Sequence, residues 1–422
     1  MKLCGTFAIL FSAFVVLTAP VLAGEQNISM GADYANDVYF SFTDDGVESR
    51  SATDWDLAFE ISGFAASVLV NHSKGIVVWH AFGVSIDNFD QLDTNGMTTN
   101  WELTYNSETS WSSGALNLGI DPNSGSLGWG EYNPITHHVD GTEIFVLQLD
   151  ATTYVKLMVE SLKSGVYTIK YANLDGSNAH SAEIAKSEFS GKNFAYYSLG
   201  SHTTIDREPL SAEWDIVFGR YIAYVGDNGD IPYVVSGVRS NIGVLCAQAD
   251  DVDPLTVSYS QDMTLSEDIN IIGHDWKEFS FTEGWVLNAR VAYFVQAYNG
   301  SIYKVYFTEF GGSADGNVGF EVGEPLSTDV AEHKGELFGS LALFPAPVTD
   351  GACTLAYAVN KHINSAQLRI VDLNGHIVLQ QNVNAAAGMH QLPLNVAGLA
   401  AGQYAVQLQL DGKTLMATLQ IH

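Results

Sequence analysis

The chain has 422 residues, which exceeds one ordinary hydrophobic core and suits two or three domains. Hydrophobic residues make up 46% and charged residues only 16%, a composition typical of a folded chain and not of a disordered one. The formal net charge of -30 repels phosphate backbones and anionic lipids, so it argues against binding to nucleic acid or to a membrane surface.

The first 23 residues predict a secretory signal peptide. Lys2 provides the positive start, an apolar run follows over 7–22, and Ala23 suits the small-residue cleavage site. The run is short for a membrane span, and no other stretch approaches eighteen apolar residues, so we expect no transmembrane segment in the mature chain. Two cysteines remain after cleavage, Cys246 and Cys353. They are expected to be small buried residues in different domains and not a disulfide.

The sequence after the signal peptide contains an internal repeat, which predicts two tandem copies of one domain. Residues 54–59 (Asp-Trp-Asp-Leu-Ala-Phe) resemble 213–218 (Glu-Trp-Asp-Ile-Val-Phe), and residues 38–42 resemble 195–199. Further pairs follow in the same order, with length differences confined to polar or Gly-rich intervals. We therefore predict domains over 24–187 and 188–330, each of a normal single-core size. The aromatic residues expected in their cores are Trp55, Phe59, Trp214 and Phe218.

Patterns with a period of two dominate both copies. In the second copy, apolar runs at 290–298 and 301–310 flank Asn299-Gly300, which predicts a tight type I′ hairpin. The first copy has three neighbouring runs of β-branched and aromatic residues. These runs cover 144–150, 153–159 and 166–171. Neither copy holds a convincing amphipathic helix of twelve residues, so the predicted fold class is all-β, with antiparallel sheets.

A change of composition near Leu341 predicts a third domain over 341–422, after a linker at 331–340. Short strands and close turns such as Asn374-Gly375 and Asp411-Gly412 predict a small β-sandwich. Strands are expected at 353–359, 367–371, 377–382, 402–410 and 414–421.

This terminal domain resembles the C-terminal sorting domain of type IX secretion, found in the Bacteroidetes. Residues 343–347 look like the family's opening, 368–375 like its central strand and turn, and 399–404 like its late motif. The residues that carry the motif are Leu343, Phe344, Pro345, Pro347, Asp350, Gly375, Gly402 and Tyr404. The chain departs from the family pattern at Ala346, where Asn is usual, and at its end, which lacks the frequent basic residue.

The resemblance implies export through the periplasm to the outer cell surface, with the type IX secretion machinery as partner. An ordinary β-sandwich accessory module is the other interpretation of this domain.

The two copies resemble the HmuY family of secreted, haem-binding β proteins. The likeness is carried in the second copy by 196–199, 213–218, 233–238 and 241–244, and the first copy is a weaker version. The resemblance implies an all-β scaffold, and haem held between paired His or Met side chains.

Three histidines of the first copy are the haem-ligand candidates. Two neutral imidazoles must reach opposite faces of one porphyrin. His137 and His138 are adjacent, so on a strand they point to opposite sides and cannot clamp one haem together. His80 with either of them is the predicted pair, and the partner would be haem or a haemoprotein. The other interpretation of each His is a hydrogen-bonded surface or turn residue.

The sequence predicts no enzyme, because it lacks a Gly-rich phosphate loop, a Gly-x-Ser-x-Gly elbow and a His-Glu-x-x-His motif. Acidic segments at 227–230 and 250–253 could hold Ca²⁺, but neither fits the calcium-loop pattern, and turns explain both more simply. Three classes of function stay open: haem or porphyrin capture, a structural or adhesive surface protein without haem, and a carbohydrate-binding or hydrolytic surface protein.

Overall fold

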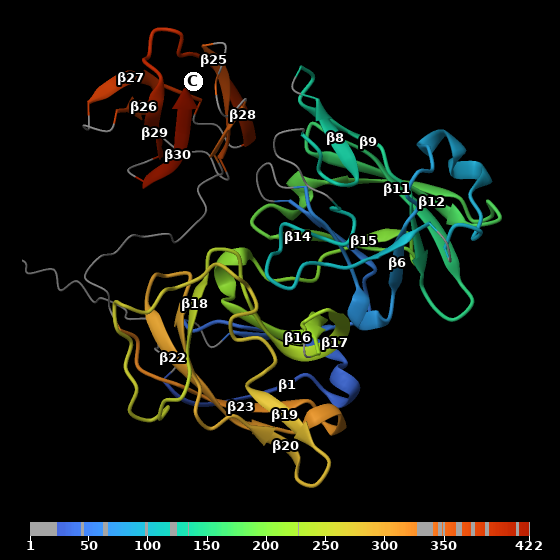
Figure 1. Ribbon diagram of the computed structural model, residues 1–422, viewed down its shortest axis with the longest axis vertical. Coiled ribbons are helices and arrows are strands. Elements are labelled where there is room, and N and C mark those ends of the chain that lie inside the picture. The colour runs from blue at the N-terminus through green and yellow to red at the C-terminus, as the bar shows by residue number, and fades with distance from the viewer. Residues whose placement is uncertain are drawn as a thin grey trace, which may run out of the picture.

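The computed structural model describes residues 23–43, 46–61, 66–97, 100–118, 125–133, 135–226, 228–326, 341–344, 348, 351–359, 365–372, 376–384, 388–410 and 413–421. Every ladder between the strands of these residues is antiparallel, and the strands gather in several sheets (Figure 1). Helical structure in these residues is limited to short 3-10 turns. The predicted all-β class is therefore confirmed. The 3-10 turns are Ala32–Tyr34, His72–Lys74, Ile86–Gln91, Lys186–Phe189, Ser211–Glu213 and Gly312–Ala314.

A first unit is formed by consecutive strands from β4 to β15. One sheet has the order β13-β12-β11-β10-β6-β7, with β9 beside β11 and β8 beside β9, and a second sheet has the order β15-β14-β4-β5. Their shared core includes Phe59, Trp129 and Tyr167, none of them exposed. The strands are β4 (Leu57–Glu60), β5 (Val68–Val70), β6 (Val77–His80), β7 (Glu102–Thr104), β8 (Gly130–Asn133), β9 (His138–Gly141), β10 (Phe145–Gln148), β11 (Tyr154–Lys163), β12 (Val166–Asn173), β13 (His180–Ala185), β14 (Phe194–Ser198) and β15 (Thr203–Ile205).

A second unit combines the beginning of the chain with the strands that follow the first unit. Its sheets have the orders β1-β23-β22-β21-β18 and β17-β16-β2-β3, with β19 and β20 as a separate hairpin. Its core includes Phe40, Phe218 and Trp276. The strands are β1 (Gly24–Ser29), β2 (Asn36–Phe40), β3 (Val47–Ser51), β16 (Ile216–Val225), β17 (Ile231–Ser240), β18 (Leu245–Ala249), β19 (Lys277–Ser280), β20 (Gly284–Leu287), β21 (Ala292–Gln296), β22 (Ile302–Phe310) and β23 (Asn317–Val322).

The two sequence copies exchange their first strands. Strand β2 of the first copy pairs with β16 of the second, with Phe40 opposite Ile216. Strand β14 of the second copy pairs with β4 of the first, with Tyr197 opposite Leu57. The self-comparison aligns Phe40 with Tyr197 and Leu57 with Ile216, so the two pairings are one interaction made twice. Likewise β1 lies at the edge of β23 as β13 lies at the edge of β12. The expected boundary at 188 thus falls between β13 and β14, inside the exchanged segment.

Several local predictions are confirmed. Strands β21 and β22 form the hairpin at Asn299-Gly300, where Gly300 has a φ of 86° that favours glycine. The three runs of the first copy are β10, β11 and β12, paired in sequence order. Of the four core aromatics expected, Phe59, Trp214 and Phe218 are buried, whereas Trp55 is half-buried. The two remaining cysteines are buried and free.

The C-terminal strands form two sheets, of orders β24-β25-β28 and β27-β26-β29-β30, around a core of their own (Figure 1). All five expected strands are present, and β24 and β28 are additional. The sequence of β28 contains Pro393, which argues against a strand, but β28 lies at the edge of its sheet, where proline is tolerated. The bounds are β24 (Leu341–Phe344), β25 (Ala352–Val359), β26 (Ala366–Val371), β27 (Ile377–Asn382), β28 (Gly388–Asn395), β29 (Gly402–Leu410) and β30 (Lys413–Ile421).

Candidate functional site: a cleft where the two copies meet

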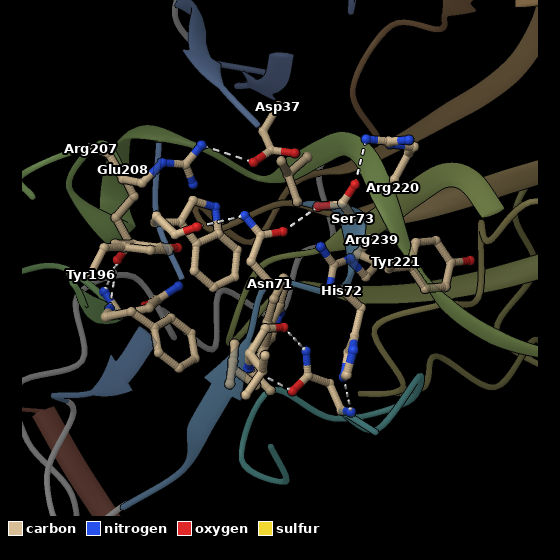
Figure 2. Close-up of a pocket in the computed structure, with 18 of the residues that line it drawn as sticks. Asp37, Asn71, His72, Ser73, Tyr196, Arg207, Glu208, Arg220, Tyr221 and Arg239 are labelled. Carbon is tan, nitrogen blue, oxygen red and sulfur yellow. Dashed lines mark hydrogen bonds and ion pairs between the residues drawn. The ribbon is translucent and has the colours of Figure 1, made fainter. Parts of the chain in front are cut away.

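A cleft with a cavity of about 40 Å³ lies between the sheet β15-β14-β4-β5 of the first unit and the sheet β17-β16-β2-β3 of the second, and we call it the seam cleft (Figure 2). Both copies and both units contribute to its walls. One wall carries Tyr39 of β2, the other Tyr196 of β14, and these two tyrosines are equivalent in the repeat. The lining comprises Asp37, Tyr39, Trp55, Leu69, Val70, Asn71, His72, Ser73, Asn106, Ser107, Trp111, Asn193, Phe194, Tyr196, Arg207, Glu208, Trp214, Val217, Arg220, Tyr221, Ile222 and Arg239.

Two equivalent aromatic pairs form opposite walls of the seam cleft. The rings of Trp55 and Tyr196 meet edge to face at 5.1 Å between centroids, and those of Trp214 and Tyr39 do the same at 5.1 Å. In each pair the tryptophan comes from one copy and the tyrosine from the other, because the strands are exchanged. The cleft therefore exists only where both copies are in place.

Arg207 is the cation of the cleft with the most polar contacts, although its Nε makes no hydrogen bond. Its Nη2 lies 2.8 Å from Asp37 Oδ2 and donates to the carbonyl of Ser51 at 2.8 Å, and its Nε lies 3.1 Å from Asp54 Oδ1. Its guanidinium also lies over the ring of Tyr196, with Cζ 4.9 Å from the centroid. These contacts tie β2 and β3 to the segment after β15.

Glu208 is a buried acid that is held by three donors. It accepts hydrogen bonds from the backbone N–H groups of Asn193 and Phe194, the second at 2.8 Å, and from the hydroxyl of Tyr196 at 3.0 Å. Burial raises the pKa of Glu208 to about 7, although these donors oppose the shift. Near neutral pH its carboxyl group is thus partly protonated.

His72 is the histidine of the lining, and it is neutral. Burial lowers the pKa of His72 to about 4. Its Nδ1 lies 2.9 Å from the carbonyl oxygen of Ile76, so Nδ1 carries the proton, and Nε2 accepts the backbone N–H of Asn106 at 3.4 Å. Both ring nitrogens are therefore occupied.

Arg239 has aromatic partners but no polar one. It lies on β17, with Cζ 4.3 Å from the ring centroid of Trp111 and 5.0 Å from that of Tyr221. Within the residues that the structure describes, its guanidinium makes no hydrogen bond and no ion pair, although the charge of Asp37 acts on it through space. Burial lowers the pKa of Arg239. Figure 2 shows Arg239 and Arg220 on one side of the cleft, and Arg207 and Glu208 on the other.

Five further polar atoms of the lining lack a hydrogen-bond partner in the described part of the chain. They are Nε1 of Trp55, Nε1 of Trp214, Nε of Arg220, the hydroxyl of Tyr221, and Nε of Arg207, which contacts Asp54 without a hydrogen bond, and all of them are buried. Arg220 does use another nitrogen, Nη2, to donate to the carbonyl of Ser73. A buried donor without an acceptor costs about 1–3 kcal/mol, so their gathering at one cavity is unusual for a purely structural seam.

The cleft is also positively charged inside a strongly acidic protein. Its lining contains three arginines (Arg207, Arg220 and Arg239) against two acids (Asp37 and Glu208), a balance of +1 with both acids ionised. The chain has only six arginines, and its formal net charge is -30. What the cavity offers a ligand is therefore cationic and rich in donors.

The three haem-ligand candidates lie outside the seam cleft. His80 ends β6, and its Nε2 lies 2.7 Å from Glu143 Oε2. His137 is in a turn with a φ of 58°, where Nδ1 lies 2.7 Å from the hydroxyl of Tyr132, and His138 begins β9. No hydrogen bond or ring contact within the described ranges joins His80 to the other two. Their role as ligands stays a prediction.

The sorting-motif residues lie partly outside the described residues. Leu343 is buried in β24, Phe344 ends that strand, and Gly402 begins β29. Tyr404 is half-buried and donates its hydroxyl to the carbonyl of Ala400 at 2.9 Å. The remaining four, Pro345, Pro347, Asp350 and Gly375, are outside the described ranges.

Sequence reasoning missed the arginines of the cleft, although a signal was present. The register places Val217 opposite Arg239, and the equivalent Ala58 opposite Leu69. Arg239 thus replaces an apolar residue of the other copy at a position that faces the same cavity. A cation that breaks the repeat in an acidic chain could have been singled out.

No helix within the described ranges is long and apolar enough to cross a membrane. Nor do three or more His, Cys, Asp or Glu side chains in these ranges gather as metal ligands would.

Comparison with known proteins assigns a family to the C-terminal domain only. No curated protein matches the chain. Thirty chains of solved structures match, among them "Biofilm associated protein - BSP domain", at 8% identity and a TM-score of 0.18. That alignment covers 61% of this chain and 59% of that one, and its TM-score is too low to support any argument. Residues 342–422 match the family of the secretion system C-terminal sorting domain. The chain ends in a type IX sorting domain, which directs it to secretion and to the cell surface.

Proposed function

We propose that the chain is a non-enzymatic binding protein that captures an extracellular ligand in the seam cleft while displayed at the cell surface. The observation that supports this most is the set of unpaired buried donors around one cavity, Trp55 Nε1, Trp214 Nε1 and Arg220 Nε, beside the unpaired guanidinium of Arg239. Their desolvation is compensated when a ligand supplies acceptors. The sorting domain accounts for the location, with the type IX machinery as its partner.

Haem capture, which the HmuY resemblance implies, is a narrower form of this proposal and would need another site. A cavity of about 40 Å³ has room for roughly two or three waters and not for a porphyrin. Haem would instead have to recruit His80, now bonded to Glu143, and His137 or His138. Titration of the mature chain with haemin tests this. A saturable low-spin spectrum that His80→Ala removes would support haem capture, and only weak absorption unaffected by this change would exclude it.

A structural or adhesive role is the second candidate, because one hairpin exposes an aromatic cluster. Phe281, at the tip between β19 and β20, is 99% exposed, and Phe279 and Trp285 are exposed beside it. The ring of Phe279 packs edge to face with both neighbours, at 5.7 Å and 5.4 Å between centroids. Such a patch suits contact with another surface without any enclosed ligand.

One experiment separates capture in the cleft from adhesion through the hairpin. The mature chain, labelled with a fluorophore, is applied to arrays of extracellular glycans and peptides, alongside Trp111→Ala and Phe281→Ser. Capture in the cleft predicts binding that Trp111→Ala removes and Phe281→Ser preserves. The opposite pattern would establish the hairpin as the contact and overturn the proposal, as would binding that neither change affects.

A further inference from the structure

We propose that the seam cleft recognises a carboxylate group, and that Arg239 is its principal contact. The inference rests on the proposed capture function and names the chemistry of the ligand. It concerns a compact anionic group, carried either by a free small acid or by an acidic sugar.

The unpaired polar groups select for an anion. Arg220 Nε, Trp55 Nε1 and Trp214 Nε1 can only donate hydrogen bonds, as can the guanidinium of Arg239, and the unpaired hydroxyl of Tyr221 can donate as well as accept. The two acids of the lining are already engaged, Asp37 by Arg207 and Glu208 by Tyr196 and two backbone N–H groups. A ligand that brings only acceptors therefore complements the cavity, whereas a cation or a donor-rich ligand does not.

The aromatic neighbours fix how Arg239 can bind. Trp111 and Tyr221 both lie close to its guanidinium, at 4.3 Å and 5.0 Å from Cζ. Trp111 is itself fixed, because its Nε1 donates to the carbonyl of Ser240 at 2.8 Å. A guanidinium held by rings keeps its N–H groups free, and a planar carboxylate matches this fork with two parallel hydrogen bonds.

Size and charge agree with this ligand class. About 40 Å³ holds roughly two or three waters, which is close to the three heavy atoms of a carboxylate. The lining is cationic by one charge with both acids ionised, and by two when Glu208 is protonated. The exposed acids elsewhere on the chain repel anions, so a carboxylate is attracted to this cleft and to few other places.

Tryptophan fluorescence of the mature chain offers a direct assay, because Trp55, Trp111 and Trp214 line the cleft. Sodium acetate, sodium glucuronate and sodium phosphate are titrated at constant ionic strength against sodium chloride. We expect saturable changes with acetate and glucuronate. Tighter binding of glucuronate would point to an acidic sugar, and equal binding to free small acids. No saturable change with either, or tighter binding of phosphate than of both, would overturn the carboxylate assignment.

Variants test the role of Arg239 itself. Arg239→Gln should weaken acetate binding at least about tenfold, since the variant loses the charge-assisted hydrogen bonds to the carboxylate. Arg239→Lys keeps the charge but loses the two parallel N–H groups, so its affinity for acetate should lie between those of the parent and Arg239→Gln. Arg290→Gln, at an exposed site outside the cleft, is the control and should bind acetate as the parent does. Unchanged affinity in Arg239→Gln would contradict the inference. If that variant does not fold, Arg239→Lys and Arg220→Gln decide the question by the same comparison.

This inference and the proposed function fail in different ways. If array binding depends on Trp111 but neither acetate nor glucuronate changes the fluorescence, the capture function is supported and the carboxylate assignment is contradicted. If acetate binds but no ligand on the array does, the carboxylate assignment is supported and the capture function is contradicted.

Discussion

Asp56 and Asp215 hold the two exchanged strands in the same way. Oδ2 of Asp56 accepts the backbone N–H of Leu199 at 2.7 Å, and Oδ2 of Asp215 accepts that of Phe42 at 2.7 Å. Each aspartate comes from one copy and each N–H from the other. The exchange is therefore secured twice by buried, charge-assisted hydrogen bonds.

Replacing Asp215 by Ala should lower the free energy of unfolding by about 3 kcal/mol, because buried N–H groups lose a charged acceptor. The affected donors are Phe42 N and Tyr298 N, the latter at 2.8 Å from Oδ1. Urea denaturation measures the loss, with Asp262→Ala at an exposed position as the control. If both variants lost the same small amount, the role assigned to Asp215 would be wrong.

Strand exchange predicts which fragments fold. Residues 52–205 contain every strand of the first unit, so this fragment should melt cooperatively by circular dichroism. Residues 24–187 lack β14 and β15, and they carry β1 without β23 and the β2–β3 hairpin without β16, so they should aggregate or pair with another chain. Stable monomers of both 24–187 and 188–330 would show that the exchange is not required.

Glu208 should make the stability depend on pH. Its pKa in the folded protein is about 7 against an ordinary 4.5, so its contribution is fully present below pH 4.5 and is lost as pH rises through 7. Glu208→Gln cannot titrate and keeps an acceptor for the backbone N–H of Phe194. Relative to this variant, the parent should lose about 3 kcal/mol between pH 4.5 and 7.5.

Urea denaturation at several pH values checks this expectation, with Glu183→Gln at an exposed position as the control. A difference between the parent and Glu208→Gln that stays constant with pH would show that Glu208 is not the titrating group.

Deleting residues 341–422 should leave the protein in the periplasm, because the signal peptide carries it across the inner membrane only. Labelling of intact cells and fractionation measure the location. Ala346→Asn, which restores the residue usual in the family motif, is the matched control and should reach the surface at least as well as the parent. Surface labelling of the truncated chain at the parent level would refute the sorting role.

The sequence was sufficient for the fold class, the repeat and most strands, because these depend on local patterns. The apolar run of β2 and the Asn299-Gly300 turn have the same sequence signal whichever strand lies alongside. For that same reason the exchange was not predictable: an apolar edge such as that of β2 fits either β4 or β16, and long-range pairing decides between them.

The seam cleft was still less accessible to sequence reasoning. Arg207 pairs with Asp37, which lies 170 positions away in the chain, and Trp55 meets Tyr196 only because the strands are exchanged. The histidines drew attention because of the family resemblance. Arg220 and Arg239 lie on strands, where alternation marks them only as outward-facing residues, and Arg207 lies in the loop after β15.

The most direct test of the central claim, that the cleft between the exchanged copies is an anion-binding site, is a crystal structure of the mature chain soaked in sodium bromide. Bromide scatters anomalously, so its positions can be identified without ambiguity from water. The account predicts a peak in the cleft within hydrogen-bond reach of Arg239. A cleft that holds only water, while bromide binds lysines and arginines elsewhere on the surface, would contradict it.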